Sequence, residues 1–172
     1  MPTFRTAEHI EPLLAEVMKT YHPDLFEAGV MVGVLTAHAK EGADGEPRGP
    51  ALTHHGSQAA AVIKITSQAD RAAGLPDCIL KLDGDRWDTW TTERQTAILD
   101  HELTHVLLDR DADGTVRTDD SNRPKLKMRP HDVDLGIFED VVKRHKEHAG
   151  ESVNFAEAHK IFTQALFPWG MT

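Results

Sequence analysis

The sequence predicts a single α+β domain, in which a small mixed sheet is combined with several helices. Short runs of β-branched and apolar residues occur in the first half of the chain, and amphipathic stretches flank them. The length of 172 residues suits one domain with its own core, and neither a repeat nor a linker divides the chain. We therefore expect one domain over residues 1–172, with residues 40–58 as a flexible loop because glycine and proline are frequent there.

The first helix is expected from Thr6 to about His22, where apolar residues recur at helical spacing until Pro23 ends the pattern. Strands are predicted at Gly29–Ala39, Ala59–Thr66 and Asp77–Leu82. A short helix capped by Ser67 should separate the second strand from the third. The third strand lies just before the next helix, so we expect it to be the sheet edge beside the functional site. An extended peptide could add to that edge through main-chain hydrogen bonds.

The most informative stretch is the helix expected at Thr92–Asp109, which contains the pattern His-Glu-x-x-His. On a helix, His101 and His105 lie one turn apart on the same face, so both imidazoles can bind one metal ion. Glu102 projects beside that ion, where it can take a proton from metal-activated water. The pattern predicts a metal-dependent hydrolytic site with Glu102 as the general base.

Two features support a helix at this place. Thr92 and Gln95 stand at the spacing of a capping box at its start. Leu99, Leu103 and Val106 form an apolar face that can be buried against a core.

A hydrolytic zinc site uses three protein ligands and leaves one position for water. The third ligand is expected on a helix predicted from Pro130 to His148. His131 is the first choice, because a neutral imidazole matches the other two ligands, and Asp134 and Glu139 are the alternatives. We therefore predict one zinc ion, bound by the two histidines of the motif and by His131.

Other side chains are candidates to assist this site. Asp132 and Asp100 could accept a hydrogen bond from a ligand imidazole and so orient it. Arg144 and His145 could donate to the oxyanion that forms when a peptide carbonyl is attacked.

The acidic stretch Asp109–Asp120 has carboxylates and a glycine at the spacing of a calcium-binding loop. Its last position is an aspartate rather than the longer glutamate that chelates through both oxygens, and no helix start follows it. No Ca²⁺ is therefore expected at Asp109–Asp120, and an acidic turn leading into a strand at Lys125–Met128 is preferred. A last helix is predicted from Val153 to Phe167.

Several residues have a structural interpretation. Cys78 is the single cysteine, so no internal disulfide can form, and its place in a strand predicts a small buried side chain. Trp87 and Trp90 are expected to pack at the corner between strand and helix. The adjacent His54 and His55 are expected to be solvated, with a flap over the site as the alternative.

The composition narrows the range of partners. The formal net charge of −9 does not favour nucleic acid or an anionic membrane as the main partner. No apolar run approaches the length of a membrane span, and no secretory signal opens the chain, so a cytoplasmic location is expected. The oligomeric state does not follow from the sequence.

Five stretches between Ala61 and His145 carry a family resemblance. They are AVIKITSQADRAAGLPD, the W-x-x-W before the motif helix, ILDHELTHVLLD, the acidic D-x-D-G turn and KMRPHDVDLGIFEDVVKRH. With them the chain resembles the putative phage metallopeptidase family. The last stretch is also similar to SprT-like zincins, whose third histidine lies on the helix after the motif and just ahead of a buried phenylalanine. That similarity independently implies His131 as the third ligand.

The resemblance implies a single-domain zincin-like metalloprotease fold with one H-E-x-x-H helix and a following helix that carries the third ligand. Family members often continue Arg-His-Gly, whereas this chain has Arg144-His145-Lys146, so we expect its helix to run on further. The function implied is a zinc-dependent metallopeptidase from a phage or prophage, acting on a protein or peptide substrate. One alternative is a zincin-fold binding or regulatory module with little turnover, and another is a SprT-like DNA-associated protease. The intact Glu102 favours the enzyme over the binding module, and the acidic charge disfavours the DNA-associated protease.

Overall fold

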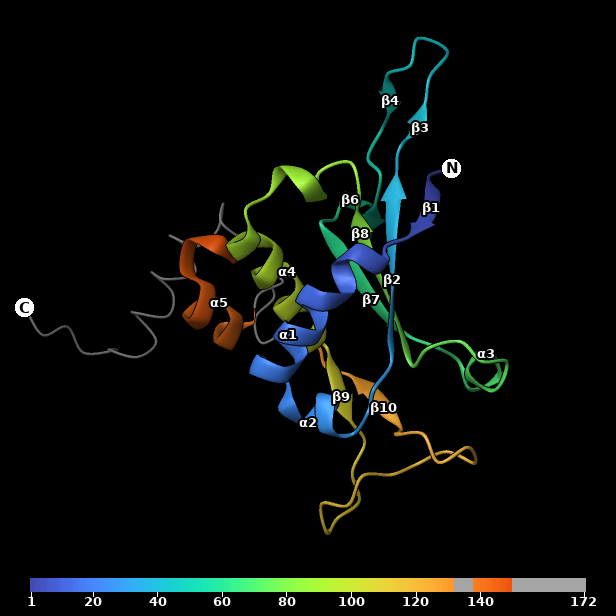
Figure 1. Ribbon diagram of the computed structural model, residues 1–172, viewed down its shortest axis with the longest axis vertical. Helices are drawn as coiled ribbons and strands as arrows, with labels where there is room; N and C mark the ends of the chain where they lie inside the picture. Colours follow the sequence, from blue (N-terminus) through green and yellow to red (C-terminus); the bar gives the residue numbers. More distant parts are fainter. Residues whose placement is uncertain (132–137, 150–172) are drawn as a thin grey trace, which may run out of the picture.

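The computed structural model describes residues 1–131 and 138–149, which form a mixed sheet with helices packed on one face (Figure 1). The predicted combination of a small mixed sheet with several helices is therefore confirmed. The helix predicted at residues 153–167 lies outside the described residues.

The sheet has four strands in the order β1-β2-β8-β7. They are β1 (Thr3–Thr6), β2 (Val32–His38), β7 (Ala61–Ile65) and β8 (Cys78–Asp83). The strands β2 and β8 run parallel, while β1 pairs antiparallel with β2 and β7 pairs antiparallel with β8. Three of the four strands were predicted. The fourth, β1, was missed because all of its residues are exposed and no buried apolar pattern marks it.

The edge of the sheet near the motif helix is β7, and the prediction that the Asp77–Leu82 strand forms this edge is wrong. That strand is β8, which lies between β2 and β7. Its Cys78, Leu80 and Leu82 side chains are fully buried, as expected for a central strand. Proximity of β8 to the helix in the sequence was misleading, because β7, from earlier in the chain, pairs with the side of β8 that β2 leaves open and so becomes the edge.

Two helices cover one face of the sheet and contact each other (Figure 1). They are α1 (Glu11–Tyr21) and α4 (Thr92–Thr104). The first helix, α1, is shorter than predicted. A 3-10 turn, η1 (Glu8–Ile10), precedes it, and a separate short helix, α2 (Pro23–Glu27), follows it.

A further helix, α5 (Glu139–His145), packs against α4 and is followed by a 3-10 turn, η3 (Lys146–His148) (Figure 1). The prediction that this helix runs on further is wrong, because Lys146 has a φ of 50° and ends the helix at His145. None of the helices in residues 1–131 and 138–149 is both long and apolar enough to cross a membrane.

The core fills the space between the sheet and the helices α1 and α4. It includes Leu14 and Val17 of α1, Ile63, Leu80 and Leu82 of the sheet, and Leu99 and Leu103 of α4. Each such side chain contributes about 1.5–3 kcal/mol when it is fully buried. Because one side of α4 is fixed in this core, the opposite side must face away from it, and that side carries the motif histidines.

The motif helix begins at Thr92, as predicted, but it differs from its prediction in its cap and at its C-terminal end. Its N-cap is Thr91 rather than Thr92, because the Thr91 hydroxyl accepts a 3.4 Å hydrogen bond from the amide of Arg94. It ends at Thr104, because the next residues form strand β9 (Val106–Leu108), which pairs antiparallel with β10 (Leu126–Met128). Strand pairing therefore overrides the helical periodicity that extends to Asp109.

The chain between β9 and β10 is a long hairpin with bridges at Arg110–Val116 and Thr118–Pro124. The predicted strand at Lys125–Met128 is confirmed as β10. Within the acidic stretch, the guanidinium of Arg117 pairs with the carboxylates of Asp109 and Asp111.

Residues 40–58 fold into two short hairpins. The first pairs β3 (Lys40–Glu41) with β4 (Pro47–Arg48) and projects from the end of the sheet (Figure 1). The second pairs β5 (Thr53–His54) with β6 (Ser57–Gln58) and leads directly into β7. We refer to this second hairpin as the His54 hairpin.

The predicted cap of the short helix α3 (Gln68–Ala72) is confirmed, because the Ser67 hydroxyl accepts a hydrogen bond from the amide of Asp70. The packing predicted for the two tryptophans is also confirmed. Trp87, in the 3-10 turn η2 (Trp87–Thr89), is buried, and its ring meets that of Trp90 edge to face at 6.1 Å.

Candidate metal centre

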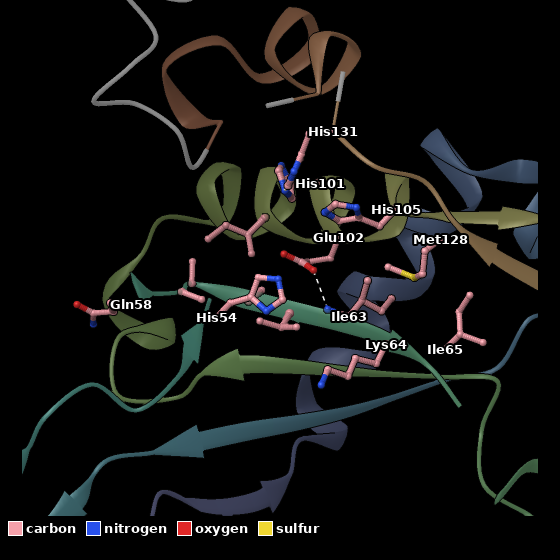
Figure 2. Close-up of a pocket in the computed structure, with 15 residues that line it drawn as sticks. His54, Gln58, Ile63, Lys64, Ile65, His101, Glu102, His105, Met128 and His131 are labelled. Carbon is pink, nitrogen blue, oxygen red and sulfur yellow. Dashed lines mark hydrogen bonds between the residues drawn. The ribbon is translucent and has the colours of Figure 1, made fainter. Parts of the chain in front are cut away.

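Helix α4 places the imidazoles of His101 and His105 on one face, with ring centroids 5.3 Å apart (Figure 2). Leu99 and Leu103, on the opposite face, are fully buried. That burial fixes the rotation of the helix about its axis, so both imidazoles project toward the same point, as the spacing predicts.

His131 reaches the same point from the segment that follows β10. Its Nε2 lies 3.2 Å from Nε2 of His101. One ring nitrogen from each of His101, His105 and His131 lies within 4.8 Å of the other two. Two ligands of a tetrahedral zinc ion are about 3.3 Å apart when each zinc–nitrogen bond is about 2.0–2.1 Å. The donor set therefore fits an ion of this size and geometry.

His131 itself is not helical, so the predicted helix from Pro130 to His148 is wrong at its start. The described helix in this region, α5, begins at Glu139. A proline disfavours helical backbone at the residue before it. Arg129, just before Pro130, instead pairs with the end of α4, because its amide donates to the carbonyl of His105 at 2.7 Å. This pairing carries His131 across the face of the motif helix.

The second ring nitrogen of His105 fixes its orientation. Nδ1 lies 2.8 Å from the carbonyl oxygen of Arg129 and donates to it, which leaves Nε2 with its lone pair. Burial lowers the pKa of His105 to about 4, and the nearby imidazoles of His101 and His131 also lower it, whereas the bond to Arg129 raises it. The ring is therefore neutral at neutral pH, as a metal ligand must be.

An apolar ring supports all three imidazoles. The side chain of Phe138 is fully buried, and its centroid lies 5.0 Å from that of His101, 4.6 Å from that of His105 and 5.0 Å from that of His131. This is the buried phenylalanine that the SprT-like resemblance implied. Its packing restricts the tilt of each imidazole and so favours a preformed donor set.

Glu102 lies beside the histidines and is largely buried, with 7 % of its surface exposed. Its Oε2 accepts a 2.8 Å hydrogen bond from the main-chain amide of Ile63 in β7 (Figure 2). A carboxylate held in this way is fixed in orientation. The position suits a group that takes a proton from water next to the histidines.

The edge strand β7 turns main-chain groups toward this site. The main-chain groups of Ala60 and Thr66 bond to the β8 side of the sheet. Because main-chain directions alternate along an antiparallel strand, those of Ala61, Ile63 and Ile65 point the other way. The edge therefore offers amides and carbonyls to an extended chain that lies beside Glu102.

The site opens into a cavity of about 660 Å³ between β7, α4, the end of β10 and the His54 hairpin (Figure 2). A volume of this size is typical of a ligand site. Its apolar wall consists of Ala59, Ala60, Ala61, Val62, Ile63, Ile65, Ile98 and Met128. Its polar lining consists of His54, Gln58, Lys64, Glu102 and the three candidate ligands.

Three residues predicted to assist the site do not line this cavity. The carboxylate of Asp100 instead binds Arg144 through two hydrogen bonds of 2.8 Å and His145 through one of 2.7 Å. The proposed roles of Arg144 and His145 as oxyanion donors, and of Asp100 as support for a ligand, are therefore wrong. Asp100 precedes His101 by one residue, and neighbours on a helix point about 100° apart.

The remaining candidates from the sequence are not tested by the structure. Asp132 and Asp134 lie outside the described residues, and for Glu139 the description covers the main chain alone.

His54 is exposed, as the sequence analysis expected, and it also lines the cavity. The sequence His54-His55-Gly56 has no regular spacing relative to the His-Glu-x-x-His motif, so the sequence did not connect His54 with that motif. One signal was present, because His-Gly is compatible with a tight hairpin turn just before a strand. That turn would have placed His54 near the edge of the sheet.

Comparison with known families matches residues 3–165 to the family described as "Putative phage metallopeptidase". No curated protein and no solved structure matches the chain. The family match confirms the resemblance seen in the sequence and extends it beyond the stretch from Ala61 to His145.

Proposed function

Since the chain belongs to the Putative phage metallopeptidase family, we propose that it is a zinc-dependent peptide hydrolase with His101, His105 and His131 as the metal ligands. The observation that carries the proposal is the convergence of these three imidazoles beside the buried carboxylate of Glu102. A catalytic zinc site typically has three protein ligands and an open fourth coordination position, whereas a structural site is closed by four protein ligands. In this proposal the carboxylate of Glu102 lies beside the open position.

The donor set favours zinc over harder cations. Imidazole nitrogens suit zinc, copper, iron and nickel, while magnesium and calcium prefer oxygen ligands. A bound zinc ion would supply the Lewis acidity that lowers the pKa of water and polarises a peptide carbonyl.

Glu102 is the general base in this proposal. It accepts a proton from the attacking water and then delivers it to the amine that leaves. The amide of Ile63, 2.8 Å from its Oε2, holds the carboxylate toward the cavity. Proton transfer of this kind contributes about 10²–10⁴-fold to the rate.

The substrate is a protein or peptide bound in extended form along β7. The outward main-chain groups of Ala61 and Ile65 can pair with it, on either side of the Ile63 amide that contacts Glu102. Main-chain pairing does not depend on the substrate sequence, so selectivity would come from side chains that meet the apolar wall of the cavity.

The test is metal analysis combined with digestion of an unfolded protein such as casein. Wild type should bind about one zinc per chain and cleave the substrate. Glu102→Gln should keep the zinc, because it changes no ligand, and should lose about 10²–10⁴-fold in kcat. His105→Ala and His131→Ala should each bind zinc weakly.

The outcomes separate the parts of the proposal. If His131→Ala retains zinc as wild type does, the third ligand is another residue. If wild type binds zinc and cleaves nothing, a binding module of the same fold is the better account. If wild type binds no metal, the proposed site is wrong.

A further inference from the structure

We infer that His54 is a catalytic residue of this site, whose imidazole donates a hydrogen bond to the oxyanion formed on the substrate carbonyl. The inference rests on the proposed peptidase function and adds a residue to it. A hydrolase that attacks a carbonyl gains most from donors aimed at the oxygen where negative charge develops. Arg144 and His145 bind Asp100, so among the residues that the structure describes we sought this donor elsewhere along the cavity.

The position of His54 is the first support. Its imidazole lines the same cavity as His101, Glu102 and His105, and it projects there from the side of the His54 hairpin (Figure 2). Helix α4 and the His54 hairpin thus face the same cavity from different sides.

The other polar side chains of the cavity are less suitable. Among the described lining residues outside the ligand set and Glu102, these are Gln58 and Lys64. The amide nitrogen of Gln58 bonds to the carboxylate of Asp83 at 3.4 Å, and the Lys64 chain extends away from Glu102 (Figure 2). The imidazole of His54 remains as the donor that faces the site.

The hairpin gives His54 a defined position. Thr53 pairs with Gln58 and His54 with Ser57, which leaves a two-residue turn. Both turn residues have positive φ, 48° for His55 and 81° for Gly56, as in a type I′ turn, whose twist matches that of paired strands.

Leu52, at the base of the His54 hairpin, is buried against Ala37 and Val62 of the sheet. Its carbonyl also accepts the amide of Ala59 at 3.1 Å, which closes the base of the hairpin. The donor is therefore attached to the same sheet that carries the edge strand β7.

The protonation state of His54 suits this role. Although His54 is exposed, partial desolvation of its side chain lowers its pKa, and the charges of His55 and Lys64 lower it further. A neutral imidazole retains one N–H donor, and it avoids the repulsion that a cation would feel beside a divalent metal ion.

The experiment compares three variants of the full chain loaded with zinc. His54→Phe keeps an aromatic ring but removes the donor, and His54→Gln restores an N–H donor. His55→Asn is the matched control, because it alters the neighbouring exposed imidazole while asparagine tolerates the positive φ at this position. Each variant is measured for zinc content, for kcat and KM on casein-derived peptides, and for affinity toward a phosphinic peptide. The tetrahedral anionic group of that peptide resembles the oxyanion.

His54→Phe should keep its zinc and its KM, and its kcat should fall by about 100-fold. This is the lower end of the range for loss of an oxyanion donor, and we expect it because His54 is exposed. Its affinity for the phosphinic peptide should fall by a similar factor, His54→Gln should recover part of both losses, and His55→Asn should match wild type.

Two results would overturn the inference while leaving the proposed function intact. One is a His54→Phe variant that matches wild type in kcat and in affinity for the phosphinic peptide. The other is loss of zinc from His54→Phe, which would make His54 a ligand. A wild-type protein that neither cleaves peptides nor binds the phosphinic peptide would refute the proposed function itself.

Discussion

The carboxylate of Asp100 joins three helices at one buried point. It accepts hydrogen bonds from His22 at the end of α1 and from Arg144 and His145 of α5, while its own main chain belongs to α4. Burial alone would raise its pKa, but the hydrogen bonds from His145, His22 and Arg144 outweigh burial and hold the pKa well below its usual range. The ionised form is therefore the one that stabilises the fold.

Replacing Asp100 by Asn should lower the free energy of unfolding by about 2–4 kcal/mol at pH 7, because it removes the charge that Arg144 and the histidines contact. In the unfolded chain the pKa of this carboxyl is about 3.9, and in the folded chain it is lower. The contribution is therefore fully present above about pH 4–5 and is lost as the pH falls toward the folded-state pKa.

Urea unfolding at pH 7 and pH 3 tests this expectation. The difference between wild type and Asp100→Asn should be clearly smaller at pH 3. Asp88→Asn, which changes an exposed carboxylate, should have little effect at either pH. An Asp100→Asn difference that is the same at both pH values would contradict the assignment.

At the scale of single residues, the sequence predicted which side chains could bind a metal better than it predicted where each side chain points. His101, Glu102 and His105 lie where the helical spacing requires. Asp100 was expected to support a ligand imidazole, but it is adjacent to His101 in the sequence, and adjacent helical residues share no face. The Cys78 prediction is confirmed, since the thiol is fully buried and burial raises its pKa to about 12.

At the scale of elements, the β9–β10 hairpin delivers two parts of the site, the Arg129 carbonyl that orients His105 and the third histidine, His131. The hairpin is attached to the body of the protein by Arg123. Its guanidinium contacts the carboxylate of Asp77, which is almost fully buried, and donates to the carbonyls of Arg71 and Leu75.

Arg123→Ala should lower the free energy of unfolding by about 2–4 kcal/mol, because four hydrogen bonds are lost and the buried Asp77 keeps Arg71 as its remaining guanidinium partner. It should also weaken zinc binding by about tenfold, a loss typical of residues that support metal ligands. Chelator competition and urea unfolding measure the two effects.

Two further variants define the role of Arg123. Arg123→Lys should recover little, since an ammonium group lacks the planar fork that reaches several acceptors. Arg110→Ala removes a half-exposed side chain from the same hairpin and should leave zinc affinity unchanged. If Arg123→Ala binds zinc as tightly as wild type, the hairpin does not depend on this anchor to position His131.

Element boundaries were the weaker part of the prediction. The strands β2, β7, β8 and β10 and the helices α1, α3 and α4 occur where hydrophobic patterns predicted them. The end of α4 was misjudged because Val106, Leu107 and Leu108 continue its apolar pattern but pair with β10. Such pairing depends on a segment that returns from later in the chain, which local periodicity does not record.

At the scale of the whole molecule, a metal ion at this site would link α4 to the segment that follows β10. The β9–β10 pairing and the bond from the Arg129 amide to the His105 carbonyl already bring these two parts together, so the ion would reinforce an existing contact. Binding to the folded state alone stabilises it by mass action.

Removal of zinc should therefore lower the melting temperature. At a free zinc concentration 100-fold above Kd, the stabilisation is about 2.7 kcal/mol, which corresponds to about 5–10 °C for a chain of this length. Thermal unfolding with zinc and after treatment with EDTA measures the shift. His105→Ala should show almost none, and an equal shift in that variant would mean that zinc acts elsewhere.

The sequence by itself determined the local features of this protein. The placement of His101 and His105 on one helix face, with Glu102 beside them, follows from the helical repeat. Most strands and helices follow from apolar periodicity. The choice of His131 rested on residue type and resemblance, and the structure brings this residue within 4.8 Å of the other two imidazoles.

Only the tertiary structure decided which elements meet. It made β7 the edge strand, directed Asp100 to Arg144 and His145, and placed His54 in the cavity. Each of these three features depends on contacts between residues far apart in the sequence. The relative orientation of two elements decides whether such residues meet. Periodicity fixes the direction of a side chain within its own element, but core packing and strand pairing fix how the elements are arranged.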